Sequence, residues 1–175
     1  GLVHRIDRPV SGAVIFAKTS KALSRMTIKV KEREFSKTYL AIVKNKPPHE
    51  AGELLDYMIK NETQNKSYIV SSNTKGAKLA QLRYRVIGSS DSYYLLEVEL
   101  ITGRHHQIRA QLSHMGCPIK GDLKYGAKRS NPDGGISLHA RKIEFIHPVS
   151  KLPIVITAPI PEDTLWRTLE NNIPL

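Results

Sequence analysis

One carboxylate stands between two arginines in the stretch His4-Arg5-Ile6-Asp7-Arg8-Pro9-Val10-Ser11-Gly12. Pro9 favours an extended residue before it, and Ser11-Gly12 turns the chain into the apolar run at 13–17, for which we predict a short buried strand. Asp7 would then lie on a stiff loop entering a sheet, where a rigid scaffold can aim it. Flanking positive charge favours the ionised carboxylate that a nucleophile or charge stabiliser needs. From this segment alone, a surface aspartate paired with a neighbouring arginine is the simpler alternative.

The composition fits one folded domain with a buried core. The chain has 175 residues, of which 40% are hydrophobic and 25% are charged, and this balance argues against disorder. No apolar run approaches the roughly 18 residues of a membrane span, so we expect no membrane partner. The single cysteine, Cys117, cannot form an internal disulfide, which fits a reducing compartment. We therefore expect a cytoplasmic protein, and we expect a monomer.

The basic side chains are concentrated in two stretches of the sequence. Residues 1–46 carry a net charge of +8 and residues 103–151 a net charge of +6, whereas residues 47–102 are nearly neutral at −1. If the fold brings the two basic stretches together, they form one positive surface suited to a polyanion. A solvated basic surface that only maintains solubility is the alternative that composition leaves open.

Hydrophobic periodicity predicts a mixed α/β (α+β) domain with a mainly antiparallel sheet flanked by helices and loops. A helix is predicted from residue 19 or 20 to about residue 34, with Leu23, Met26 and Val30 on its inner side. The strand predicted at 37–43 has two apolar faces, because residues 39, 41 and 43 point one way and residues 40 and 42 the other. The remaining predictions are strands at 53–59, 67–70, 80–87, 93–100, 137–146 and 153–157, helices at 105–115 and 162–170, and a loop at 117–135.

A second informative stretch begins at Leu100-Ile101-Thr102-Gly103-Arg104 and continues through the predicted helix. Gly103 permits close backbone approach, and Arg104 could pair with a carboxylate or a phosphate near the positive end of the helix. The histidines at 105, 106 and 114 invite a metal interpretation, but no Cys, Asp or Glu within that helix completes a site, so we predict no metal. The glycine-rich motifs of dinucleotides and nucleoside triphosphates are missing, so we expect no cofactor, nucleotide or otherwise.

Four segments together resemble the RluA-type family of RNA pseudouridine synthases: HRIDRPVSG, KTYLAIV, LITGRHHQIRAQLSHMGCPIKGDLKYG and SLHARKIEFIHP. The resemblance runs over nearly the whole chain. It implies that Asp7 is the catalytic carboxylate and that Tyr39 is the active-site tyrosine. It also implies that Arg104 pairs with the catalytic aspartate, and that Leu138 lines the uracil pocket.

The activity implied by the resemblance is the isomerisation of uridine in structured rRNA or tRNA, with RNA as the partner. The N1–C1′ bond breaks and a C5–C1′ bond forms, and Asp7 acts either at C1′ or on the uracil ring. Tyr39 would stack on the base and remove the C5 proton, and Arg5 would fill the place that the flipped base leaves. We also expect three residues to bind substrate, the last of them through the RNA backbone: His106, Gln107 and Arg109.

The resemblance has one departure. Family members usually carry strands and a Lys-Pro motif ahead of the HRIDR-like stretch, and some carry an S4-type RNA-binding domain. We therefore expect residues 1–175 to be a catalytic domain truncated on its N-terminal side. Two other functions stay open, namely a catalytically inactive RNA-binding module and an RNA-processing hydrolase that uses Asp7 with a metal.

Overall fold

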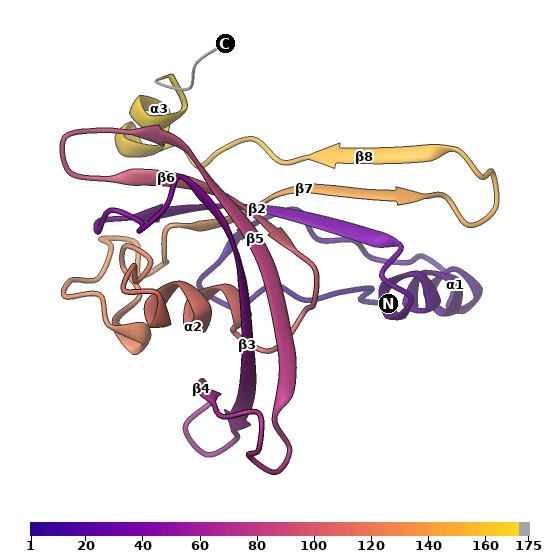
Figure 1. Ribbon diagram of the computed structural model, residues 1–175. Helices are drawn as coiled ribbons and strands as arrows, with labels where there is room; N and C mark the ends of the chain where they lie inside the picture. The colour runs from indigo at the N-terminus through magenta and orange to yellow at the C-terminus, as the bar shows by residue number, and fades with distance from the viewer. Residues whose placement is uncertain (172–175) are drawn as a thin grey trace.

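The structure is a computed structural model that describes residues 1–171. Within these residues, eight strands form one sheet in the order β1-β7-β2-β6-β5-β3-β4, with β8 also paired to β7 (Figure 1). All neighbouring strands are antiparallel except β1 and β7. The strands are β1 Ser11–Gly12, β2 Phe35–Val43, β3 Ala51–Asn61, β4 Lys66–Val70, β5 Lys78–Ser89, β6 Tyr94–Leu100, β7 Leu138–Ile146 and β8 Pro153–Thr157. The predicted α+β domain with a mainly antiparallel sheet is confirmed.

In the described part of the chain, three helices flank this sheet: α1 Ser20–Lys31, α2 Gln107–His114 and α3 Thr164–Asn171, with a short 3₁₀ turn at Leu123–Tyr125. α1 begins as predicted, because the Thr19 hydroxyl accepts the backbone N–H of Ala22. It ends earlier than predicted, since Arg33 adopts a left-handed conformation with φ 61° and turns the chain into β2. No helix in residues 1–171 is long and apolar enough to cross a membrane.

β2 separates two apolar cores, as its sequence alternation predicts. Tyr39, Ala41 and Val43 pack in the cluster that contains Ile108 and Leu112 of α2. On the other face, Leu40 and Ile42 pack with Trp166 and Leu169 of α3. α2 and α3 therefore cover opposite faces of the sheet, which Figure 1 shows as helices below and above β2 and β6. Tyr39 faces the α2 side, and so does the cavity described below.

The strand predicted at 13–17 is wrong. In this part of the chain the pairing with β7 is limited to Ser11 and Gly12, and Phe16 is 68% exposed. The reason lies in β7, whose residues 142–146 pair on that edge with β8, so the edge is already occupied. Gly12 itself is required, because a Cβ there would lie 2.3 Å from the carbonyl oxygen of Ala140, at a φ of 122°.

The other predicted strands and helices are present, with small shifts of their ends. α2 starts at Gln107 rather than at residue 105, because His106 has a left-handed backbone with φ 54°. This turn matters for the site, since it decides which side chains at the start of α2 face the sheet.

Candidate active site

All eight residues expected to act in catalysis or binding line one cavity between the loop at 5–10, β2 and the start of α2. They are Arg5, Asp7, Tyr39, Arg104, His106, Gln107, Arg109 and Leu138. The cavity is an open hollow with about 450 Å³ of empty space, its mouth and the adjoining solvent included. The sequence thus predicted which residues meet. Their individual contacts differ from the expectation in several places.

The loop that carries Asp7 is held at several points. The Val10 N–H donates to the carbonyl of Asp7 at 2.9 Å, and the Ile136 N–H donates to the carbonyl of Pro9 at 3.0 Å. The loop then enters β1, where the Ser11 hydroxyl lies 2.8 Å from Nδ1 of His139. The Asp7 side chain is 27% exposed, so it is accessible from the cavity but largely enclosed.

Arg109, not Arg104, contacts Asp7. The Nη1 of Arg109 lies 3.4 Å from Oδ2 of Asp7, and its Nε and Nη2 each donate to a carboxylate oxygen of Asp122 at 2.8 Å. Both Arg109 and Asp122 are buried. The expectation that Arg109 contacts the RNA backbone is therefore wrong, because this guanidinium lies inside the protein between two carboxylates.

The expected pair of Arg104 and Asp7 is wrong for a geometric reason. Arg104 lies before the left-handed turn at His106, and its Nε donates to the carbonyl of Leu79 at 2.8 Å. Arg109 follows in α2, a helix in which residues 107–112 are all buried, so its side chain must find partners inside. Arg104 still lines the cavity, with a different role from the one expected.

Gln107 holds the backbone ahead of α2. Its side-chain oxygen accepts the Arg104 N–H at 2.9 Å and the Thr102 hydroxyl at 2.7 Å. Its side-chain nitrogen donates to Gln81 and Gln111, both at 3.0 Å. With these four contacts inside the protein, the Gln107 amide is engaged in shaping the loop at 102–106, although it borders the cavity.

The pKa of Asp7 is raised, chiefly by burial. The positive charge of Arg109 acts in the opposite direction, but Asp122 already neutralises much of that charge through its two hydrogen bonds. This explains why burial outweighs the arginine. Asp7 is thus oriented by Arg109 without being strongly stabilised in its charged form.

Tyr39 presents a neutral hydroxyl to the cavity. The side chain is buried, and burial together with the nearby charge of Asp7 raises its pKa to about 12. Its hydroxyl makes no hydrogen bond with any residue in the part of the chain that the structure describes. It is therefore available to a bound ligand as a hydrogen-bond donor.

His106 is neutral and its tautomer follows from its neighbours. Burial, followed by the charge of Arg109, lowers its pKa to about 3. The Tyr125 hydroxyl accepts the Ser67 N–H at 2.9 Å and lies 2.8 Å from Nδ1 of His106. We assign the hydroxyl proton to this second contact, so that the tyrosine donates to Nδ1. The ring proton then sits on Nε2, which is 3.9 Å from Oδ2 of Asp7. Because that distance is too long for a hydrogen bond, this N–H is free for a ligand.

Three cavity or supporting residues were missed from the sequence: Lys37, Asp122 and Tyr125. Lys37 lies two residues before Tyr39 in β2 and lines the same cavity, so the strand alternation could have found it. Asp122 and Tyr125 fall in the segment predicted as loop, and only the tertiary structure brings them under α2. Residues 1–171 contain no cluster of three or more His, Cys, Asp or Glu able to hold a metal.

Comparison with known proteins gives the family. Residues 1–114 match the family described as RNA pseudouridylate synthase. The chain belongs to that family. Ribosomal large subunit pseudouridine synthase D of Xylella fastidiosa is 34% identical over 93% of this chain and 52% of its own. tRNA pseudouridine synthase C of Vibrio cholerae is 31% identical over 95% of this chain and 74% of its own. The RluA-type resemblance is confirmed.

Solved structures of two human proteins support the same fold for this member of the family. Human RNA Pseudouridylate Synthase Domain Containing 4 matches with a TM-score of 0.78 and 24% identity, covering 92% of this chain and 71% of that one. The human domain-containing protein 1 matches with a TM-score of 0.76. The chain spans about half the length of several curated relatives that it matches.

Proposed function

We propose that residues 1–175 form the catalytic domain of an RNA pseudouridine synthase, which isomerises uridine in structured rRNA or tRNA. The observation that supports this best is the placement of Asp7. It is a carboxylate on a firmly held loop, contacted by a buried arginine, and it opens into a cavity that also contains the unpaired Tyr39 hydroxyl. Relatives named for both ribosomal and transfer RNA support an RNA substrate. We further propose that the protein is a cytoplasmic monomer that needs no nucleotide cofactor.

The reaction balances without a redox partner. The N1–C1′ bond of uridine breaks, the uracil turns, and a C5–C1′ bond forms, after which C5 loses its proton and N1 gains one. Asp7 is the nucleophile or charge stabiliser, acting either at C1′ or on the ring. Arg109 contacts the carboxylate oxygen of Asp7 on one side, which fixes the direction in which its other oxygen can attack.

Tyr39 stacks on the uracil and takes part in proton transfer at C5. With a pKa of about 12, the phenol is protonated at neutral pH. It can accept the C5 proton only as its own proton leaves, so the hydroxyl exchanges protons in a concerted step, and the proton that it gives up is balanced by the one that N1 gains. Leu138 closes the apolar side of the pocket from β7.

Besides the Tyr39 hydroxyl, two further donors that have no partner in residues 1–171 suit the substrate. The Arg5 guanidinium is exposed at the cavity mouth, where it can fill the gap left in the RNA by the flipped uridine. The Nε2–H of His106 lies beside Asp7, within the space that the base would occupy, and it can donate to a uracil carbonyl.

The test is tritium release from RNA labelled at uridine C5, beside filter binding of the same RNA. Asp7→Asn keeps the shape of the side chain but removes the charge, so release should fall below detection while binding is kept. Asp91→Asn, an exposed aspartate of the β5–β6 turn, is the matched control and should release at the parent rate.

Three outcomes would contradict the proposal. Binding without release by the parent protein would favour the inactive RNA-binding module. RNA cleavage that EDTA abolishes would favour the metal-dependent hydrolase. Release by Asp7→Asn at the parent rate would remove Asp7 from the mechanism.

A further inference from the structure

Lys37 of β2 lies at the junction of two hollows. It lines the active-site cavity, and it also lines a groove formed by the end of α1, the start of β2 and the segment at 99–104. The cavity and the groove share four lining residues, Lys37, Leu100, Gly103 and Arg104, so the two hollows adjoin. The groove encloses roughly 1050 Å³, its open side included. Figure 1 shows where β2 follows α1, on the side of the molecule away from α2.

The ammonium group of Lys37 has no partner in the described residues. No hydrogen bond or ion pair joins it to residues 1–171, and burial lowers its pKa. Gly103 lies against it, since a Cβ at that position would be 3.3 Å from Nζ. A lysine that served only solubility would extend into water. Enclosing the charge without a counterion costs free energy, which a bound anion would offset.

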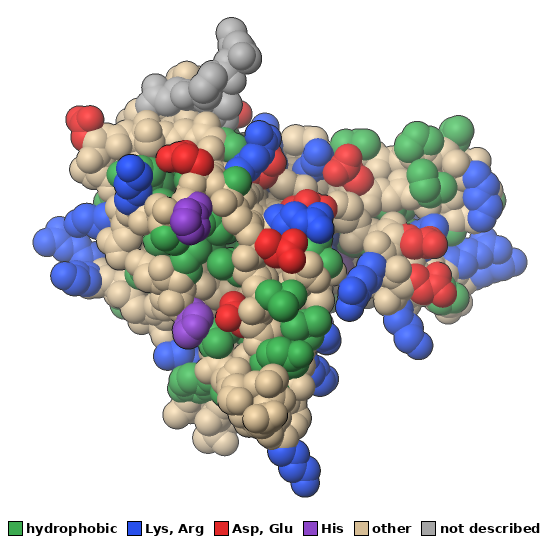
Figure 2. All heavy atoms as spheres, viewed as in Figure 1, with side chains coloured by type: hydrophobic (Ala, Val, Ile, Leu, Met, Phe, Trp, Pro, Cys, Tyr) green, Lys and Arg blue, Asp and Glu red, His purple; other side chains and the backbone are tan. Residues whose placement is uncertain are grey.

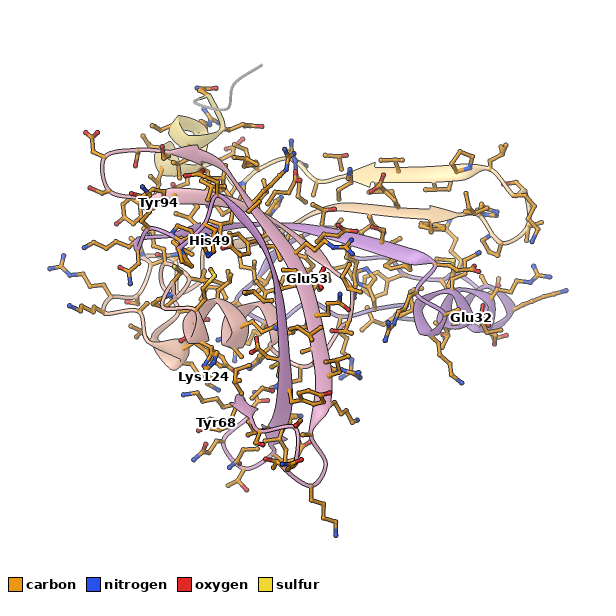
Figure 3. The ribbon with its side chains drawn as sticks, in the orientation of Figure 1. Glu32, His49, Glu53, Tyr68, Tyr94 and Lys124 are labelled. Atoms are coloured by element: carbon orange, nitrogen blue, oxygen red, sulfur yellow. The ribbon has the colours of Figure 1, made fainter. Side chains whose placement is uncertain are left out.

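The neighbouring groove carries the same sign of charge. Lys31 and Arg33, at the end of α1, line it and are exposed, next to the helix cap Glu32 that is labelled in Figure 3. Arg104 contributes a guanidinium whose two terminal nitrogens make no hydrogen bond within residues 1–171. Glu99 is the acidic residue among the lining residues, and it lies 3.8 Å from Arg83.

We propose that this groove binds the sugar–phosphate backbone of the RNA next to the target uridine. Lys37 and Arg104 bind the phosphate at the junction, and Lys31 and Arg33 bind the phosphates that follow. The inference rests on the proposed function, because RNA is the polyanion that the cavity would admit. Charge complementarity favours this occupant over an apolar segment, and because the two hollows adjoin at Lys37 and Arg104, one strand can reach from the cavity into the groove.

The experiment measures RNA affinity against salt concentration for the whole chain. Lys37→Met keeps the length and apolar stem of the side chain and removes one charge. The slope of log affinity against log salt should become shallower by about 0.7, because the variant neutralises one phosphate fewer. The variant should remain folded, since it no longer encloses an unpaired charge, and its thermal unfolding midpoint should equal or exceed that of the parent.

A matched pair on α1 separates the groove from general surface charge. Lys31→Met, at the groove, should reduce the slope as Lys37→Met does. Lys21→Met removes an exposed lysine at the other end of the same helix, which does not line the groove, and it should leave the slope unchanged. Equal effects of Lys21→Met and Lys31→Met, or no effect of Lys37→Met, would overturn the groove proposal.

The failure of this inference is distinguishable from failure of the proposed function. If the parent releases tritium and binds RNA with a salt-dependent affinity, but the Lys37→Met slope is that of the parent, only the groove is wrong. If the parent neither releases tritium nor binds RNA, the function itself is wrong, and the groove proposal fails with it.

Discussion

The two sides of the active-site cavity differ in how their polar groups are satisfied. On the side of α2, Arg109 is bonded to Asp122 and contacts Asp7, and Gln107 makes four hydrogen bonds. On the side of the 5–10 loop and β2, the side chains of Arg5 and Lys37 and the Tyr39 hydroxyl have no partner in residues 1–171. The first side holds its groups in place. The polar groups of the second side are available to a ligand. Groups without a hydrogen-bond partner in the protein cost stability, and they are retained where a substrate supplies the partner.

Substitution of Asp122 should have the largest effect on the side of the cavity formed by α2. Asp122→Ala leaves the buried Arg109 without its main counterion, and removing one partner of a buried pair typically costs about 3–5 kcal/mol. Urea unfolding should show a loss of this size, and tritium release should disappear with it. Asp91→Ala, which removes an exposed carboxylate, should leave both unchanged.

A double variant separates the structural effect from the catalytic one. Arg109→Met with Asp122→Leu replaces the ion pair by apolar groups of similar volume, which is often neutral or stabilising. Stability should return towards that of the parent, whereas release should not, because Asp7 has lost its arginine. A stable and active double variant would contradict the role given to Arg109.

The second side is tested by Tyr39→Phe. The hydroxyl has no protein partner in residues 1–171, so its loss should change the unfolding free energy little. Turnover should fall by about 10²–10⁴-fold if the hydroxyl transfers a proton. Tyr57→Phe, on the exposed face of β3, is the control and should keep the parent rate. A Tyr39→Phe variant with the parent rate would restrict Tyr39 to stacking.

Local patterns predicted the sheet well where each strand carries its own signal. The alternation in β2 correctly placed Tyr39 and Ala41 on one face and Leu40 on the other. The strand predicted from the apolar run at 13–17 is wrong because β8 pairs with the edge of β7 that this run would need. β8 lies about 140 residues further along the chain. Pairing at a distance cannot be read from a five-residue window.

The site was predicted as a set of residues but not as a set of contacts. The motif contains two arginines, Arg104 and Arg109, and the choice between them depends on the left-handed turn at His106 and on Asp122 reaching α2 from another segment. Neither is visible in residue spacing. Charge position alone also says little, since Figure 2 shows Lys and Arg side chains on several parts of the visible face.

Asp7→Asn should also change the thermal stability of the protein, in a way that depends on pH. Burial raises the pKa of Asp7 in the folded protein, so the folded state holds its proton to higher pH than the unfolded chain. Above both pKa values the ionised carboxylate therefore reduces stability, and Asn removes this penalty. The variant should melt above the parent at pH 7, by roughly 2–4 °C for each 1 kcal/mol gained. The difference should vanish at about pH 3, where both states are protonated. A variant less stable at pH 7 would contradict the direction of the shift.

The smallest effect expected is a flat pH dependence of turnover between pH 6 and 8, measured at saturating RNA. Most enzymes that use histidine as a base show a change in this range. Here His106 has a pKa of about 3 and Tyr39 a pKa of about 12, so neither titrates between these limits. Tritium release by the parent should therefore stay constant, and His106→Asn, which keeps a donor at a similar position, should show the same flat profile. A limb near pH 6.5 that disappears in His106→Asn would show that His106 gains a proton during turnover, and would place it among the reacting groups.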